Sequence, residues 1–155
     1  MTICTQNREC LFGEIVDGAM HLNQMAEMVA TVWNDLPHHY SGVDVDAFVI
    51  MPNHVHGIVM LSAGQPRGVA PTLSFPDVVH RFKSLTTARC RRRAAREGWP
   101  PFAGRLWQRN YYEHVIRDEG EMNRVREYIV NNPADWAQDE NNPAGTRRGR
   151  PPRLP

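Results

Sequence analysis

The segment VDAFVIMPNHVHGIVML, residues 45–61, contains two runs of β-branched and aromatic side chains on either side of Pro52 and Asn53. Side chains of this kind favour strands, and a Pro-Asn pair favours a tight turn between two strands. We therefore predict a β-hairpin with strands at 45–51 and 54–61.

Within the second of these strands, His54 and His56 are separated by one residue. Because side chains alternate along a strand, both imidazoles project from the same face, about 7 Å apart along the strand. Val55, Gly57 and Val59 then face the other side and supply the core. The two imidazoles could share one metal ion; the alternative is a pair of half-exposed histidines without such a role.

Three segments have the periodicity of amphipathic helices. Their apolar residues recur at intervals of three and four, over residues 22–36, 78–96 and 119–132. Pro37 is expected to end the first helix, and Pro133 to end the third, because proline cannot donate a backbone hydrogen bond.

The remaining strands are predicted at 2–5 and 106–116, and residues 7–18 are predicted to be rich in turns. The resulting order, β-α-β-β-α-β followed by one helix, is typical of an α+β fold with a ferredoxin-like antiparallel sheet and an additional C-terminal helix. Residues 134–155 are rich in Pro, Gly, Asn and Arg. We expect them to form a flexible tail, so the folded domain is placed at 1–133.

Length and composition exclude several classes of protein. The chain has 155 residues, of which 41% are hydrophobic, and this suits one domain of ordinary size. We expect no membrane span and no signal peptide, because no apolar run is long enough. Three cysteines without CxxC spacing predict neither a disulfide framework nor a thiolate zinc site, so a cytoplasmic location fits best.

The net charge of +1 conceals a strong segregation of charge along the chain. Residues 1–60 carry one arginine and seven carboxylates, whereas residues 81–109 carry nine cations and one carboxylate. A concentration of arginine suits a polyanion such as nucleic acid, although a solvated helix face has the same composition. Residues 148–151 also resemble the core of an AT-hook. The predicted DNA contacts are Arg81, Lys83, Arg89, Arg91, Arg92, Arg93, Arg109 and Arg124.

The third predicted helix carries Arg124, Tyr128 and Asn132 at successive intervals of four, so these side chains share one side of the helix. A tyrosine at the edge of an apolar stripe is most often a packing residue. A chemical role requires the helix to cross the histidine face. Asn132 could then supply an oxygen ligand, and Tyr128 could present its phenol to a phosphate.

Four motifs together resemble a known family. They are residues 49–59 (VIMPNHVHGIV), 82–84 (FKS), 107–109 (WQR) and 128–133 (YIVNNP). In this order they are similar to the REP-associated tyrosine transposases, which belong to the HUH single-tyrosine transposases of small insertion sequences. The resemblance covers nearly all of residues 2–133, and in this family several more residues usually precede the segment that matches 2–8. We therefore expect the chain to begin within its first strand.

The resemblance implies a function. The histidine pair of such enzymes binds a divalent cation, which places His54 and His56 at a Mg²⁺ or Mn²⁺ site with Asn132 as a third ligand. The tyrosine of the late helix is the nucleophile, here Tyr128. The implied activity is transesterification of single-stranded or hairpin DNA of the REP type through a 5′-phosphotyrosine intermediate, without a nucleotide cofactor.

Two further classes remain open at this point. A non-catalytic protein that binds hairpin DNA would retain the basic segment without using Tyr128. A metal hydrolase that uses activated water would cut DNA without a covalent intermediate. The resemblance also favours a monomer associated with the nucleoid, with a dimer left open.

Overall fold

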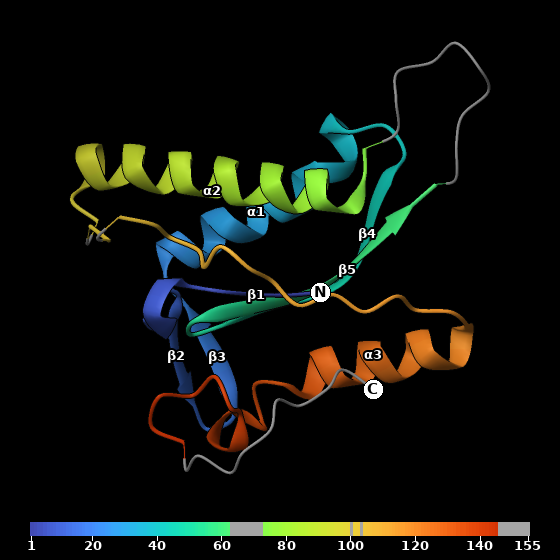
Figure 1. Ribbon diagram of the computed structural model, residues 1–155. Helices are drawn as coiled ribbons and strands as arrows, with labels where there is room; N and C mark the ends of the chain where they lie inside the picture. The colour runs from blue at the N-terminus through green and yellow to red at the C-terminus, as the bar shows by residue number, and fades with distance from the viewer. Residues whose placement is uncertain (63–72, 100, 103, 146–155) are drawn as a thin grey trace.

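The computed structural model describes residues 1–62, 73–99, 101–102 and 104–145. Its central element is a three-stranded antiparallel sheet with the strand order β1-β5-β4 (Figure 1). These strands span Thr2–Cys4 (β1), His54–Leu61 (β5) and Val43–Met51 (β4). A separate hairpin consists of β2 (Gly13–Val16) and β3 (Ala19–Leu22). The described helices are α1 (Gln24–His39), α2 (Phe75–Glu97) and α3 (Glu119–Asn131), with short 3-10 turns at Gln6–Arg8 and Trp136–Gln138.

The predicted hairpin is confirmed. Strands β4 and β5 pair from Met51 opposite His54 to Val43 opposite Leu61, with an irregularity between Val45 and Phe48. Strand β1 pairs with the other edge of β5, so that Thr2 lies opposite His56. Strand β5 is therefore the centre of the sheet, with a neighbour on each side of its first half.

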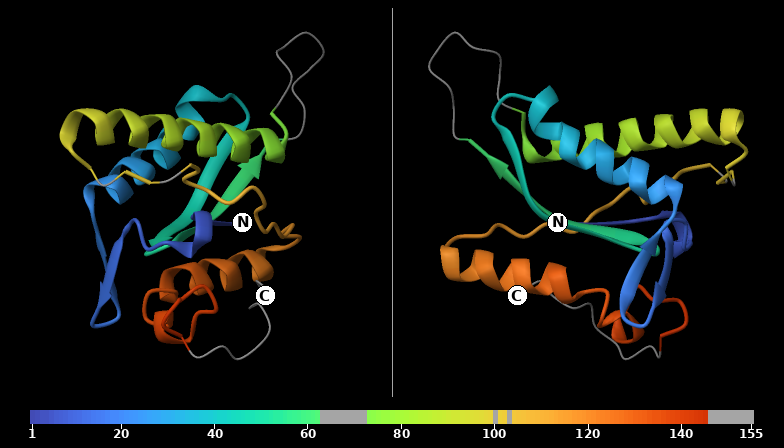
Figure 2. Two further views of the ribbon diagram at one scale, coloured as in Figure 1. Left: turned by 60° about the vertical axis from the view of Figure 1, so that its left-hand side comes forward. Right: turned by 180° about the vertical axis from the view of Figure 1, so that it is seen from behind.

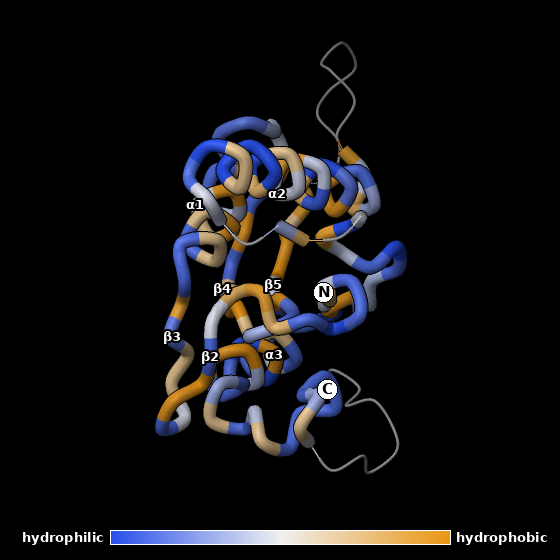
Figure 3. The backbone as a smooth tube through the Cα atoms, turned by 90° about the vertical axis from the view of Figure 1, so that its left-hand side faces the viewer, coloured by the Kyte–Doolittle hydropathy of each residue, from blue (hydrophilic) through white to orange (hydrophobic). Residues whose placement is uncertain are grey.

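The helices form two layers around this sheet. Helices α1 and α2 pack together on one face, and α3 lies on the other (Figures 1 and 2). Hydrophobic stretches of β4 and β5 run between these layers (Figure 3). The main core lies under α1 and α2, whereas a smaller cluster of Ile58, Val125 and Ile129 attaches α3. Among the described residues, no helix combines the length and the hydropathy that a membrane crossing requires.

Local capping explains where the helices begin. The Asn23 side chain accepts a hydrogen bond from the Ala26 backbone, and Asp118 does the same for Glu121 at the start of α3. Helix α2 begins with a reciprocal capping box between Ser74 and Asp77. The three helix predictions are confirmed to within a few residues at each end.

The predicted end of the first helix at Pro37 is wrong, because α1 continues through this proline to His39. Proline removes only its own backbone donor, and Pro37 lies in the last turn, where little helix remains to be disrupted. The Tyr40 backbone N–H still reaches the Leu36 carbonyl at 3.0 Å and completes the helix.

The strand predicted at 106–116 does not form. This segment instead runs beside β1 and touches it at two isolated bridges, Thr2 with Tyr112 and Thr5 with Trp107. The two bridges are three positions apart in β1, from Thr2 to Thr5, and five positions apart in the other segment, from Trp107 to Tyr112. Because these spacings differ, no continuous ladder can connect the two bridges. Burial of Leu106 and Trp107 in the core fixes the segment in this register.

Hairpin β2–β3 was not predicted; it begins within residues 7–18, which were expected only to be rich in turns, and extends beyond them to Leu22. Asp17 and Gly18 at its turn have positive φ angles of 51° and 75°. Positive φ at both central residues is the signature of a tight hairpin turn, and Asp-Gly is one of the pairs that favours it.

The chain stays folded beyond residue 133. The prediction of a flexible tail is wrong for residues 134–145, which fold back onto the β4–β5 turn and on Arg8. Specifically, the Arg8 guanidinium donates to the Glu140 carbonyl at 2.9 Å, and Asn53 donates to the Asn141 carbonyl at 2.7 Å. The residues of the predicted AT-hook lie outside the described residues.

Candidate active site

The two histidines of β5 point to the α3 side of the sheet and are buried. His54 is 0% exposed and His56 is 3% exposed. Their Nε2 atoms are 2.9 Å apart and their ring centroids 4.6 Å apart. The prediction of a shared face is confirmed, and the alternative of two half-exposed histidines is wrong. On the opposite face Val55 is fully buried, and Gly57 lies against Trp33, as predicted.

Helix α3 carries Tyr128 and Asn132 to these imidazoles. The Tyr128 ring lies 5.4 Å from the His56 ring, measured between centroids, and approaches it edge-on. Asn132 is buried, and its Oδ1 atom has no hydrogen-bond partner among the described residues. An unpaired buried carbonyl oxygen is costly unless a ligand or a cation satisfies it. The structure therefore brings His54 and His56 together with Tyr128 and Asn132. Arg124, on the same helix, stays exposed.

Apolar packing and an ion pair attach α3 to the sheet. Val125 and Ile129 pack against Ile58 of the central strand. One turn away, the Arg126 guanidinium donates two hydrogen bonds to the Asp46 carboxylate of β4, at 2.8 and 2.6 Å. These contacts fix the side of α3 that faces the histidines.

Asp139 joins this site, and the sequence analysis missed it. One carboxylate oxygen, Oδ2, lies 3.6 Å from His54 Nε2, and the Asp139 side chain is only 5% exposed. The other oxygen accepts a hydrogen bond from the Asn141 backbone at 2.7 Å. Ligand atoms of His54, His56 and Asp139 all lie within 4.8 Å of one another, which is close enough to hold one metal ion.

The electrostatics of the site suit a cation. Burial lowers the pKa of His54 to about 4, against the opposing effect of Asp139, and burial lowers the pKa of His56 well below its ordinary value. Both imidazoles are therefore neutral at pH 7, and each offers a lone pair, the form that a metal requires. Two imidazole nitrogens and a carboxylate, with the unpaired Asn132 oxygen beside them, make a donor set that could hold a metal ion.

The Tyr128 phenol does not ionise easily in this setting. Burial raises the pKa of Tyr128, and Asp139 raises it further, while Asn132 acts in the opposite direction. A positive charge beside the phenol would favour the phenolate.

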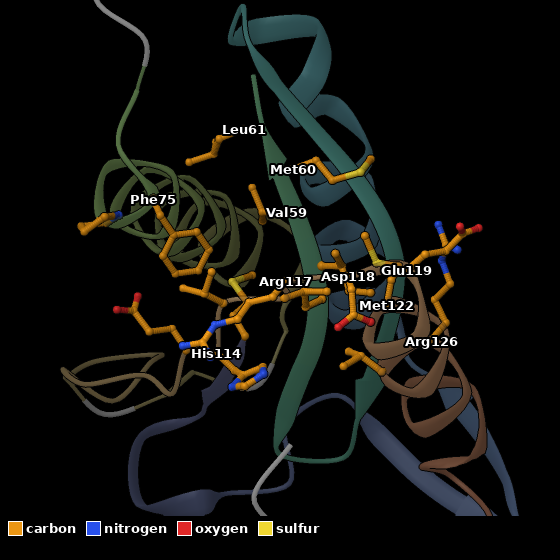
Figure 4. Close-up of a pocket in the computed structure, with 17 residues that line it drawn as sticks. Val59, Met60, Leu61, Phe75, His114, Arg117, Asp118, Glu119, Met122 and Arg126 are labelled. Atoms are coloured by element: carbon orange, nitrogen blue, oxygen red, sulfur yellow. The ribbon is translucent and has the colours of Figure 1, made fainter. Parts of the chain in front are cut away.

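Tyr128 opens onto a cleft of about 210 Å³. His56 also lines the cleft, and its other walls come from β1, from Arg8, from residues 108 and 110–112 and from residues 140–141. A larger hollow of about 770 Å³ lies at the far end of β5, between Phe75, Met122 and the 113–119 segment (Figure 4). His54, His56 and Tyr128 do not line that hollow, whose charged walls combine the acidic Glu113, Asp118 and Glu119 with the basic Arg117 and Arg126.

The basic residues of the sequence prediction have different surroundings. The Lys83 ammonium donates to the carbonyl oxygens of residues 108, 109 and 110, at 3.0 to 3.3 Å, and so holds the segment beside β1. Its three donors are occupied, so the expected DNA contact is corrected to a structural role. Arg81 lies over the Tyr40 ring, and Arg93 lies over the Trp99 ring. The remaining predicted contacts lie on α2, on the segment after it and on α3: Arg89, Arg91, Arg92, Arg109 and Arg124.

Three aromatic residues near the cleft, Trp107, Tyr111 and Tyr112, have different surroundings. Trp107 is buried and donates to the Thr86 hydroxyl at 2.8 Å, so it belongs to the core. Tyr111 packs against Phe75 and lies under the Lys83 ammonium. Tyr112 is 44% exposed at the wall of the Tyr128 cleft, where a base could stack on it.

Comparison with known proteins identifies relatives. The family described as "Transposase IS200 like" matches residues 3–132. A Haemophilus influenzae protein described as uncharacterized is 38% identical over 156 residues, which cover 90% of this chain and 82% of that protein.

Two solved structures share the fold. A REP-associated tyrosine transposase bound to a REP hairpin superposes with a TM-score of 0.58 at 21% identity, and the match covers 86% of this chain. The match covers 64% of that protein, so this chain spans less than two thirds of its length. A candidate transposase from Deinococcus radiodurans gives a TM-score of 0.51 at 20% identity, over 84% of this chain and 85% of that one. Because the family match extends over most of the chain, and because a relative shares 38% of its residues, the chain belongs to the IS200-like transposases.

Proposed function

We propose that this chain is a metal-dependent single-stranded DNA transesterase that cuts and joins hairpin DNA through a covalent bond to Tyr128. The observation that carries the proposal is the 5.4 Å separation of the Tyr128 and His56 rings, beside a buried cluster of metal-binding atoms. Nucleophile and cation site then face the same cleft, as a transfer of phosphate requires.

In the proposed reaction the Tyr128 phenolic oxygen attacks the scissile phosphorus. The new Tyr–O–P bond forms as the bond from phosphorus to the 3′ oxygen breaks. The phenol gives its proton to solvent and the departing 3′ oxygen takes a proton from solvent, which leaves a free 3′-OH and a 5′-phosphotyrosine. Since one phosphoester replaces another, the step is reversible and joins strands without ATP.

His54, His56, Asp139 and Asn132 supply the donors for the cation, and their burial excludes water from one side of the phosphate. A divalent cation held there would polarise the phosphate and stabilise the charge on the departing oxygen. Asn132 also lies beside the Tyr128 phenol and lowers its pKa against the effect of burial. The same side chain therefore serves both the donor set and the nucleophile.

The proposed substrate is single-stranded or hairpin DNA, and REP-type palindromes are the first choice. The REP hairpin bound by the solved transposase of the same fold supports this choice. The exposed arginines of α2 can follow a phosphate backbone without reading its sequence. Tyr112 offers a stacking surface at the cleft.

The test is the incubation of a labelled REP-type hairpin oligonucleotide with Mn²⁺ and the wild-type protein, followed by denaturing electrophoresis. We expect a denaturant-resistant adduct from wild type and none from Tyr128→Phe. Tyr112→Phe is the matched control, because it removes a hydroxyl from the same cleft and should leave adduct formation intact.

Other results would point to the other classes. Hairpin binding without an adduct, from wild type and variant alike, would indicate a DNA-binding protein derived from a transposase. Strand cleavage that survives Tyr128→Phe would indicate hydrolysis by activated water.

A further inference from the structure

The amide of Asn53, in the turn between β4 and β5, has a fixed orientation. Asn53 is fully buried, and its Nδ2 atom donates to the Arg8 carbonyl at 3.0 Å and to the Asn141 carbonyl at 2.7 Å. Carbonyl oxygens only accept hydrogen bonds, so a flipped amide would set oxygen against oxygen at these distances. The Oδ1 atom must therefore face the remaining neighbour, His54.

This orientation determines which nitrogen of His54 carries its proton. His54 Nδ1 lies 2.9 Å from Asn53 Oδ1. Because Oδ1 can only accept, Nδ1 must be the donor. A neutral imidazole has one ring proton, so His54 Nε2 is left with a lone pair that faces His56 and Asp139.

His56 has a partner of a different kind. Its Nδ1 atom lies 2.8 Å from the Thr2 hydroxyl, which can donate or accept. Without a cation, the contact of 2.9 Å between the two Nε2 atoms requires a proton from His56, since His54 has none there. The Thr2 hydroxyl then donates to His56 Nδ1. With a cation, His56 Nε2 must present a lone pair, so its proton moves to Nδ1 and Thr2 accepts.

We propose that Asn53 and Thr2 are positioning residues of the metal site. Asn53 fixes His54 permanently in the ligating tautomer, and the Thr2 hydroxyl allows His56 to exchange its tautomer when a cation binds. The exchange moves one proton between the two nitrogens of His56 through solvent and releases none. The inference rests on the proposed function only in taking the histidine pair as a cation site.

The same Asn53 amide connects the histidines to the segment of Asp139. Its second donor holds the Asn141 carbonyl, and the Asn141 backbone N–H in turn holds Asp139 Oδ1. One side chain thus orients an imidazole and, through Asn141, the carboxylate beside it. Partners of this outer layer commonly set the affinity of a metal site.

Nitrogen NMR of protein labelled with ¹⁵N-histidine tests the assignment directly, because protonated and unprotonated ring nitrogens have distinct shifts. His54→Gln and His56→Gln assign the signals. In metal-free protein we expect a proton on Nδ1 of His54 and on Nε2 of His56. Saturation with Mg²⁺ should move the His56 proton to Nδ1 and leave His54 unchanged. A proton on Nε2 of His54, or a His56 tautomer that Mg²⁺ does not change, would overturn the inference.

Binding of Mn²⁺ alone, followed by electron paramagnetic resonance, gives a second readout. Thr2→Val keeps the shape of the side chain and removes the hydroxyl, so we expect affinity to fall by about 10- to 100-fold, as for other outer partners. Thr2→Ser should restore it. Thr31→Val is the matched control and should leave Mn²⁺ affinity unchanged. The Thr31 hydroxyl lies on the exposed surface of α1 and donates to the Glu27 carbonyl of the same helix. Thermal unfolding of each variant separates loss of binding from loss of fold.

The outcome is independent of DNA chemistry. Wild-type affinity in Thr2→Val would overturn the role of Thr2 even if the adduct with DNA forms. The expected tautomers and affinities without any adduct would support the positioning roles and count against the transesterase.

Discussion

The close packing of Trp33 against Gly57 predicts the effect of a single added methyl group. Gly57 follows His56 on the central strand, and a Cβ atom there would lie 2.5 and 2.7 Å from two carbons of the Trp33 ring. Carbon atoms in contact lie about 3.5–4.0 Å apart, so Gly57→Ala must separate strand and ring by roughly 1 Å. Trp33 cannot retreat freely, because it stacks on Phe48 at 4.4 Å and meets the Phe82 ring edge-on at 5.8 Å.

We expect Gly57→Ala to destabilise the fold by about 1–3 kcal/mol, the range for overpacked cores. For a domain of this size, each kcal/mol lowers the melting temperature by about 2–4 °C, so the shift is about 2–12 °C. Thermal and urea unfolding followed by circular dichroism measure it.

A double-mutant cycle with Trp33→Phe tests the cause. The two ring carbons that approach Gly57 belong to the part of the indole that phenylalanine does not reach. The double variant should therefore be more stable than the sum of the single effects, by about 0.5–3 kcal/mol. A Gly57→Ala protein as stable as wild type, or strictly additive effects, would refute the packing argument.

Three further predictions concern α3 and the basic surface. Ile129→Ala should lower the free energy of unfolding, measured in urea, by about 2–5 kcal/mol, because it removes most of a side chain from the small cluster under α3. Val130→Ala is the control and should change it little, because the Val130 side chain is 70% exposed. Equal effects of the two substitutions would contradict the assigned faces of α3. The two hydrogen bonds from Arg126 lower the pKa of Asp46 in the folded protein. The stability that they contribute is therefore fully present above the ordinary aspartate pKa of about 3.9, and it is lost as the pH falls through the lowered pKa of the folded state. Urea titrations should accordingly show that wild type has a higher free energy of unfolding than Asp46→Asn near neutral pH, and that this difference disappears in acid. A difference that grows in acid would contradict the argument. In hairpin binding measured at several salt concentrations, Arg92→Gln should reduce the slope of log affinity against log salt by about 1. Lys83→Gln should leave this slope unchanged and lower the melting temperature of the protein. The reverse pattern would mean that Lys83 contacts DNA.

Local patterns were sufficient to predict most of the fold. The β4–β5 hairpin follows from two runs of strand-forming residues around Pro52 and Asn53, and the helices follow from apolar spacing and their caps. The shared face of His54 and His56 follows from the alternation of a strand alone. Their approach to Tyr128 needed only the additional expectation that the last helix crosses that face.

The failures occurred where distant contacts outweigh local preference. Residues 106–112 have strand-forming side chains, but core burial of Trp107 and unequal spacing of the two bridges prevent a ladder. Asp139 lies in a segment whose composition resembles a disordered tail. Two hydrogen bonds hold this segment in place, one donated by Asn53 and one by Arg8. Both donors lie more than 80 residues away in sequence, and no periodicity of the sequence predicts such contacts.

The central claim is that Tyr128 forms the covalent bond to DNA. Proteolysis of the protein–oligonucleotide product, nuclease trimming and peptide mass spectrometry locate the linked residue directly. We predict one modified peptide, with the nucleotide mass on Tyr128. Attachment at Tyr112 or at any other side chain, or DNA cut in Mn²⁺ with no modified peptide, would contradict the assignment.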